Sequence, residues 1–207
     1  MKAVGIFGGT FDPIHLGHLI CAQYVFEKRE LEKIIFIPCK TSPHKTNATS
    51  AESLHRLEMI KLAIADIPYF DYSDFEINKK EISYSVDTVL HFKKKYENLE
   101  LIIGEDNFSS LDTWKQPEKI IELSTIIVLQ RNISVTPNKN KFTKSVVYLN
   151  SPIIDISATD IRDKIKNNKP INFLTPVLTA FCNKFIVPII FVFASKVGSA
   201  TLFLTSI

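Results

Sequence analysis

The chain has 207 residues and a mass of 23.5 kDa, which fits one domain with a sizeable core. A hydrophobic share of 45% and a charged share of 23% exclude a largely disordered chain. The formal net charge of +3 suits phosphate-bearing ligands, but it is too small and too dispersed to indicate a nucleic-acid surface.

Strand-length and helix-length patterns alternate along the chain. Short apolar runs predict strands at residues 3–7, 34–37, 69–75, 101–103, 125–130 and 146–149. Helical spacing predicts helices at 15–29, 52–65, 86–96, 117–123 and 157–167, and residues 39–51 are typical of a polar loop. This order predicts an α/β fold, a Rossmann-like doubly wound parallel sheet with helices on both faces. Ligands then bind beyond the carboxyl ends of the strands, where the strand order reverses.

The first two predicted helices are each expected to bury one face. For the first, that face holds Leu16, Leu19, Ile20 and Tyr24. For the second, the inner side holds Leu54, Leu57, Ile60, Leu62 and Ile64. Both faces are expected to pack on the sheet.

The most informative stretch is Gly8-Gly9-Thr10-Phe11-Asp12-Pro13-Ile14-His15-Leu16-Gly17-His18, between the first strand and the first helix. Its two glycines let the backbone approach a phosphate closely and adopt positive φ. Backbone N–H groups and the helix end then offer a site to an anion. Neither G-x-G-x-x-G nor G-x-x-x-x-G-K-[ST] is present, which argues against a dinucleotide oxidoreductase and a P-loop NTPase.

His15 and His18 stand three residues apart at the start of a helix, so both rings are expected on one side. A single histidine would favour a hydrogen-bonded structural role. A zinc site would need at least one further ligand, and no neighbouring His or Cys supplies it. Two histidines beside a Gly-rich turn favour phosphate binding, because ring N–H groups donate to phosphoryl oxygens, more strongly when charged.

The stretch from Gly8 to His18 resembles the H-x-G-H element of the nucleotidyltransferase superfamily, which binds a triphosphate. Six further segments resemble nicotinate-nucleotide adenylyltransferases in the same order: Ser42-Pro43-His44-Lys45, Arg56-Leu57-Glu58-Met59, Ser83-Tyr84-Ser85-Val86-Asp87-Thr88, Ile102-Ile103-Gly104-Glu105-Asp106, Leu111-Asp112-Thr113-Trp114 and Ile156-Ser157-Ala158-Thr159-Asp160-Ile161-Arg162. The resemblance covers residues 1–186, a nucleotidyltransferase domain. It implies an enzyme of NAD biosynthesis that transfers the adenylyl group of ATP to nicotinate mononucleotide, giving nicotinate adenine dinucleotide and pyrophosphate.

A second phosphate segment is expected at the start of the last predicted helix. Ser157 is predicted as its N-cap, and capping alone would explain that residue. Arg162 lies one turn further beside Thr159, however, so the segment offers hydroxyls, N–H groups and a guanidinium to an anion. In the resembled family it binds the ATP phosphates opposite the histidines; Ala158 here replaces a more usual serine.

The resemblance places the acceptor at Lys45, Tyr84, Ser85 and Trp114. Lys45 would reach the acceptor's phosphate from the polar loop. Trp114, the only Trp in the chain, either fills a core gap or stacks on a ligand. In the family, the Trp and the backbone near the Tyr hold the pyridine ring and its carboxylate. Asp106 would contact the nucleotide sugar or phosphates, although Glu105 replaces a usual small residue beside it.

The implied reaction is attack of the acceptor's phosphate oxygen on the α-phosphorus of ATP. Because that oxygen is already anionic, positioning and charge neutralisation carry the catalysis, with no general base or covalent intermediate. His15, His18 and Arg162 are the predicted catalytic residues. The other predicted nucleotide-binding residues are Gly8, Gly9, Thr10, Phe11, Ser157 and Thr159. Mg²⁺ would be held mainly by ATP phosphates and water, with no metal site of the protein's own.

Two other classes stay open. One is a different enzyme of the superfamily, such as phosphopantetheine adenylyltransferase or a cytidylyltransferase, against which the Tyr84, Asp87 and Trp114 segments count. The other is a nucleotide-binding module without turnover. The sequence decides neither between nicotinate and nicotinamide mononucleotide nor whether the protein forms a homo-oligomer.

Three cysteines, Cys21, Cys39 and Cys182, show no paired spacing, so neither a zinc knuckle nor a disulfide framework is indicated. No secretory signal opens the sequence, because its first apolar run is only strand-length. We therefore expect a cytoplasmic protein that binds small molecules, with no nucleic-acid or membrane partner.

Residues 187–207 form an apolar extension in which only Lys196 is charged. Its length approaches the roughly 20 residues of a membrane span. Pro188, Lys196 and Gly198 interrupt it, and a lysine at mid-span costs about 2.5–3.5 kcal/mol. An accidental extension at the end of the gene is therefore favoured over a tail anchor. Residues 173–186 resemble the family's closing helix.

Overall fold

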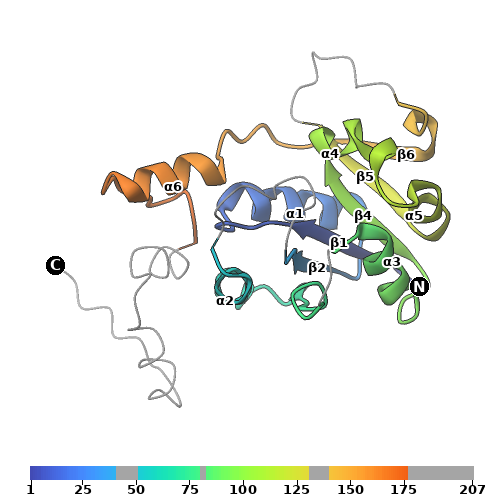
Figure 1. Cartoon of the computed structure of the whole chain (residues 1–207), viewed down its shortest axis with the longest axis horizontal. Helices are drawn as coiled ribbons and strands as arrows, with labels where there is room; N and C mark the ends of the chain where they lie inside the picture. Colours follow the sequence, from blue (N-terminus) through green and yellow to red (C-terminus); the bar gives the residue numbers. More distant parts are fainter. Residues whose placement is uncertain (41–50, 80–82, 131–139, 177–207) are drawn as a thin grey trace.

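The computed structural model describes residues 1–40, 51–79, 83–130 and 140–176. These ranges form one six-stranded parallel sheet in the order β3-β2-β1-β4-β5-β6 (Figure 1). The strands are β1 (Val4–Gly9), β2 (Lys33–Pro38), β3 (Phe70–Tyr72), β4 (Leu99–Gly104), β5 (Thr125–Gln130) and β6 (Val146–Asn150). The helices are α1 (Leu16–Lys28), α2 (Ser53–Ile64), α3 (Ser85–Lys93), α4 (Glu105–Ser109), α5 (Pro117–Leu123) and α6 (Ala158–Lys166), with 3₁₀ turns η1 (Leu111–Thr113) and η2 (Thr143–Ser145). The predicted α/β fold is confirmed.

The strand order reverses between β1 and β4. On one side of β1, Gly9 lies opposite Pro38 of β2, and on the other side Phe7 lies opposite Ile102 of β4. The chain builds outward from β1 to β3, crosses back to β4, and builds outward again to β6. The carboxyl ends of β1 and β4 therefore flank the crevice where doubly wound sheets bind ligands.

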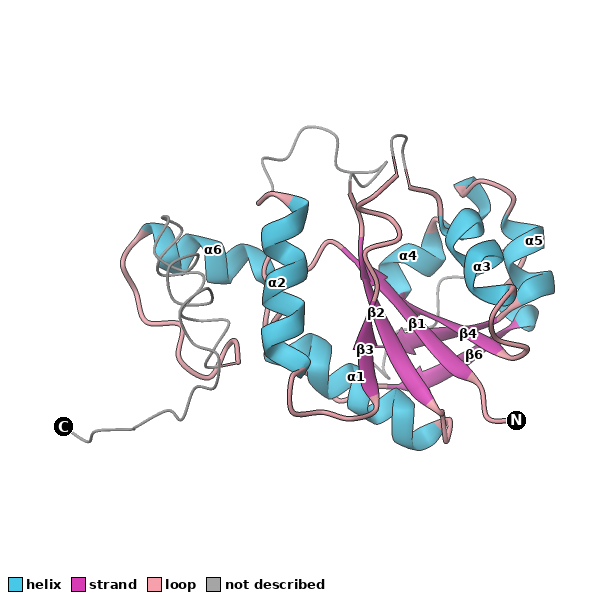
Figure 2. Cartoon of the chain, turned by 90° about the horizontal axis from the view of Figure 1, so that it is seen from below, coloured by secondary structure: helices cyan, strands magenta, loops and turns pink. Residues whose placement is uncertain are grey.

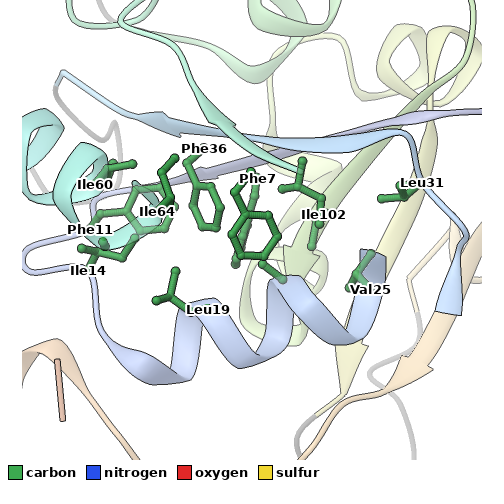
Figure 3. Close-up of a cluster of buried hydrophobic side chains, with 14 of the residues drawn as sticks. Phe7, Phe11, Ile14, Leu19, Val25, Leu31, Phe36, Ile60, Ile64 and Ile102 are labelled. Atoms are coloured by element: carbon green, nitrogen blue, oxygen red, sulfur yellow. The ribbon is translucent and has the colours of Figure 1, made fainter. Parts of the chain in front are cut away.

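Helices cover both faces of the sheet, as predicted. Phe7 and Phe36 point to one face and pack against α1 and α2, as Figure 3 shows. Ile6 and Leu101 point to the other face and pack against α3, α4 and α5. Figure 2 shows α1 and α2 on one side of the strands and α3 and α5 on the other. Because neighbouring residues of a strand face opposite sides, runs that are apolar throughout are buried on both.

The predicted inner faces of the first two helices are partly wrong. In α1 the buried stripe runs through Leu19, Ala22 and Val25, so Ile20 is turned away from it and is 41% exposed. In α2, Leu54 lies in the first turn and is 60% exposed. A charged residue, Arg56, takes a buried place on α2 instead.

Several boundaries also differ from the sequence prediction. β1 continues through both glycines to Gly9, and β3 has only three residues. α4 and η1 were not predicted, because residues 105–113 are mostly polar and carry only two apolar anchors, Phe108 and Leu111. By contrast, β5 and α5 have the predicted bounds.

The apolar extension 187–207 and most of the predicted closing helix lie outside the described residues. Residues 171–176, which precede them, form turns rather than a helix. Leu174 nevertheless contacts the start of α1, where its carbonyl accepts a hydrogen bond from the Leu16 N–H at 2.9 Å. Among the described helices, none is long and apolar enough to cross a membrane.

Candidate active site

The turn between β1 and α1 leaves open space at the end of the sheet. A Cβ atom added to Gly8, or to Gly104 at the end of β4, would meet no heavy atom within 4 Å. A ligand can therefore approach the backbone closely at both switch-point strands. The prediction that the turn glycines adopt positive φ is wrong: no described glycine does, and Phe11 takes that conformation with φ of 49°.

Phe11 belongs to the core as well as to the turn. Its side chain is 2% exposed and packs edge-on against Phe7, with ring centroids 5.7 Å apart. The same ring lies 5.0 Å from His18, between centroids. Packing thus explains the positive φ of Phe11, and any phosphate contact from this residue would have to come from its backbone.

The two histidines form one unit at the start of α1. His15 is the N-cap residue, and its ring stacks on that of His18 with centroids 3.7 Å apart. The backbone N–H of His15 donates to Nδ1 of His18 at 3.2 Å. Gly17 makes room for this arrangement, because a Cβ there would lie 3.0 Å from Nδ1 of His15. The prediction that both rings lie on one side is confirmed.

The hydrogen bond to His18 determines which ring nitrogen carries a proton. Since Nδ1 accepts from a backbone N–H, the proton of the neutral ring is on Nε2. Nε2–H is then a donor for a ligand oxygen.

Arg56 holds the turn between β1 and α1 in place, a role that was not predicted from the sequence. Its side chain is fully buried. Nη1 donates to the Thr10 carbonyl at 2.5 Å, Nη2 to the Cys39 carbonyl at 2.7 Å, and Nε to the Ala51 carbonyl at 3.0 Å. The guanidinium therefore ties the turn between β1 and α1, the predicted phosphate turn, to the end of β2 and to Ala51, just before α2. The only indication of this role in the sequence was that Arg56 lies in one of the segments that resemble the family.

The start of α6 reaches the same turn. Ser157 is its N-cap, as predicted, and its Oγ accepts from the Asp160 N–H at 3.1 Å. Arg162 donates from Nη1 to the Asp12 carbonyl at 2.7 Å and from Nη2 to Oγ1 of Thr159 at 3.1 Å. The structure thus brings the two predicted phosphate segments together, although they lie 150 residues apart.

A pocket of about 560 Å³ lies beside the turn between β1 and α1. Seven predicted site residues line it: Gly8, Gly9, Thr10, Tyr84, Ser85, Asp106 and Trp114. Tyr84 is the N-cap of α3, so the first N–H groups of this helix lie next to the pocket. The indole Nε1 of Trp114 is buried and has no hydrogen-bond partner among the described residues. The Trp114 side chain is partly buried against the core under α3 and α5.

Among the other residues that line this pocket are Cys39, Glu76 and Lys115, none of which was predicted to belong to the site. Burial raises the pKa of Glu76, and the Thr88 hydroxyl, which donates to Oε1 at 2.6 Å, opposes that rise. Burial likewise raises the pKa of the Cys39 thiol, which makes it a poor nucleophile. Lys115 lies with Nζ 4.4 Å from the centre of the Tyr84 ring.

The arrangement places the predicted anion site beside a pocket with aromatic walls. His15, His18, Thr159 and Arg162 lie around the turn, and Tyr84 and Trp114 lie in the pocket. Lys45, predicted to hold the acceptor's phosphate, lies outside the described residues. Such a site can hold a polyphosphate beside a flat ring.

Comparison with known proteins gives a consistent picture. Residues 6–164 match a family model described as cytidylyltransferase-like. The "Probable nicotinate-nucleotide adenylyltransferase" of Caldicellulosiruptor bescii is 42% identical over 178 residues, which are 83% of this chain and 90% of the relative. The protein of the same name from Clostridium novyi is 38% identical over 186 residues, 85% and 93% of the two chains.

A solved structure shares the fold. Plasmodium falciparum nicotinic acid mononucleotide adenylyltransferase, complexed with NaAD, matches with a TM-score of 0.70 over 88% of this chain and 94% of the other. At 20% sequence identity, this likeness concerns the fold alone.

Proposed function

The chain belongs to the cytidylyltransferase-like family of nucleotidyltransferases, and from its relatives at 38% and 42% identity we infer that it is a nicotinate-nucleotide adenylyltransferase. It uses ATP and nicotinate mononucleotide to form nicotinate adenine dinucleotide and pyrophosphate. One structural observation supports this function above the others: a single pocket runs from the phosphate turn at Gly8–Thr10 to Tyr84 and Trp114. A cytoplasmic location fits the reduced thiol of Cys39.

The triphosphate of ATP is assigned to the turn and the helix starts around it. His18 donates from Nε2–H to a phosphoryl oxygen, and His15 holds the His18 ring by stacking. Thr10 and the backbone of Gly8 and Gly9 face the α-phosphate. These are fixed donors, so they stabilise the charge that develops in the transition state without further reorganisation.

The β- and γ-phosphates are assigned to the start of α6. Ser157 and Thr159 carry hydroxyls there, and the free N–H groups of the first helical turn favour an anion. Arg162 is already oriented by Asp12 and Thr159, and its remaining N–H groups can donate to phosphate oxygens. The pyrophosphate leaves from this side.

The acceptor is assigned to the pocket. Trp114 and Tyr84 offer flat surfaces to its pyridine ring, and the N–H groups at the start of α3, near Ser85, suit the ring carboxylate. Asp106 is assigned to the nucleotide end of the pocket, where it can accept a hydrogen bond from a ribose hydroxyl. The acceptor's phosphate then points to the turn, in line for attack on the α-phosphorus.

Mg²⁺ is proposed to arrive with ATP. Within the described residues no three His, Cys, Asp or Glu side chains gather as a metal-binding group. Phosphate oxygens and water suit Mg²⁺, which keeps several waters and takes one or two carboxylates at most. The ion would neutralise phosphate charge, while the protein supplies positioning.

An adenylyl-transfer assay tests the function. Purified protein with ATP should release pyrophosphate and form a dinucleotide with nicotinate mononucleotide. CTP in place of ATP, and phosphopantetheine as acceptor, serve as controls for the other activities of the superfamily. Transfer to phosphopantetheine alone, or nucleotide binding without any turnover, would contradict the assignment.

A further inference from the structure

Lys115 stands at the edge of the acceptor pocket with its charge in a defined place. Its side chain is exposed and lines the pocket, and Nζ lies 4.4 Å from the centre of the Tyr84 ring. A cation over an aromatic face is attracted by the negative face of the ring. No described carboxylate forms an ion pair with Lys115. The ammonium is therefore held near the pocket and available to a ligand.

The pocket has two ends, and Lys115 belongs to one of them. Gly8, Gly9 and Thr10 form the end at β1, where the turn leads to the two histidines and Arg162 contacts Asp12. Tyr84, Trp114 and Lys115 come from the start of α3 and the segment between η1 and α5. The acceptor's phosphate has to meet ATP at the β1 end, so its ring occupies the other end. Lys115 accordingly faces the ring rather than the phosphate.

The other charged groups of the pocket leave this bias in place. Asp106 follows Gly104, at the switch point, and so belongs to the nucleotide end. Glu76 is buried, and its Oε1 is occupied by the Thr88 hydroxyl. Burial also raises the pKa of Glu76, which disfavours its negative form. Asp87, in the first turn of α3, is paired with Lys79 at 3.1 Å. At the ring end, Lys115 and the N–H groups at the start of α3 therefore set the sign of the potential.

We propose that Lys115 is a specificity-determining residue that makes the enzyme prefer an acceptor with an anionic ring substituent, nicotinate mononucleotide, over the neutral amide, nicotinamide mononucleotide. The proposal rests on the proposed function, since it assumes a pyridine nucleotide as acceptor. The two acceptors have the same phosphate and ribose and differ by one charge at the ring. A lysine at the ring end distinguishes them by that charge alone.

The variant Lys115→Met tests this, because Met keeps an unbranched apolar side chain and removes the charge. The ratio of kcat/KM for nicotinate mononucleotide to that for nicotinamide mononucleotide should fall by about two- to fivefold, the scale of an exposed charge pair. Salt should lower this ratio in the unchanged protein and much less in the variant. Lys119→Met, at an exposed position of α5 outside the pocket, is the matched control and should keep the ratio.

Binding provides a second measurement that does not need turnover. Trp114 is the only Trp of the chain and lines the pocket, so its fluorescence reports occupancy of the ring end. In Lys115→Met, the Kd for nicotinate mononucleotide should rise and that for nicotinamide mononucleotide should stay within about twofold.

Equal losses for both nucleotides would overturn the proposal and assign Lys115 to the phosphate or to the fold. An unchanged ratio would also overturn it, leaving Lys115 a solvated side chain. If the unchanged protein adenylated neither nucleotide, the proposed function would fail by itself, and the fluorescence titrations would still decide whether Lys115 distinguishes the two ring substituents.

Discussion

Replacing Arg56 by Met is expected to destabilise the fold strongly, although the change keeps an apolar side chain of similar length. Arg56 is 1% exposed, and its three nitrogen atoms donate to the carbonyls of Thr10, Cys39 and Ala51 at 2.5–3.0 Å. A buried carbonyl left without its donor costs about 1–3 kcal/mol. Relaxation and the removal of a buried cation offset part of this sum, so we expect a net loss of about 3–4 kcal/mol in the free energy of unfolding.

Thermal and urea denaturation measure this loss. For a chain of this length, 1 kcal/mol shifts the melting temperature by about 2–4 °C, so Arg56→Met should melt about 6–16 °C lower. The matched control is Lys61→Met on the same helix, where the lysine is partly exposed and pairs with Glu58 at the surface. That control should change the free energy of unfolding by no more than about 0.5 kcal/mol.

The same variant should also impair the reaction at temperatures where it is folded. Arg56 holds the Thr10 carbonyl, so its loss lets the phosphate turn move, and kcat/KM for ATP should fall more than the KM for the acceptor rises. A cost below about 1 kcal/mol, with an unchanged kcat/KM for ATP, would refute the idea that this guanidinium organises the turn.

Three other changes have defined expectations. His18→Ala should lower kcat by about 10²–10³-fold, the scale for losing one fixed donor to a developing charge, and a loss under about threefold in folded protein would exclude His18 from that role. Because burial raises the folded-state pKa of Glu76 above its ordinary 4.5, the stability it contributes is present below 4.5 and is lost as pH rises through the folded value. Glu76→Gln should remove this fall in urea denaturation measured across the weakly acidic range, whereas parallel profiles would contradict the assignment. Ending the chain after Ile186 should leave adenylyl transfer intact and raise the soluble yield, since residues 187–207 are an apolar run with no assigned role; an inactive but folded truncation would move the domain boundary.

The sequence predicted those elements whose pattern depends on their own residues. β5 is a run of apolar residues between polar ends, and α5 begins with proline at its first position, so both were predicted with the bounds that the structure has. The predicted buried face of α1 was wrong at Ile20, because this helix carries apolar residues on all sides. Only packing selects the stripe through Leu19 and Val25.

The residues of the candidate site likewise divide into those that the sequence could predict and those that it could not. The histidine pair and the N-cap at Ser157 could be predicted, because each depends on residues three apart. The contacts of Arg56 and Lys115 could not be predicted, because the fold sets their partners. Thr10 is 46 residues from Arg56, and Tyr84 caps α3, whereas Lys115 lies between η1 and α5. The positive φ at Phe11, rather than at either glycine, likewise follows from packing in the core.

Two arginines from distant parts of the chain hold the turn that is proposed to bind phosphate. Carbonyl oxygens repel phosphate, and this turn has two that are covered by guanidinium groups: Arg56 takes the Thr10 carbonyl and Arg162 takes the Asp12 carbonyl. A trans peptide places its N–H opposite its C=O, so holding the Thr10 carbonyl toward Arg56 turns the Phe11 N–H away from it. The peptide after Asp12 has no N–H to offer, because Pro13 follows, and its carbonyl is the one that Arg162 neutralises. We therefore propose that phosphate binding at this turn depends on the docking of both α2 and α6, which would tie it to the completed fold.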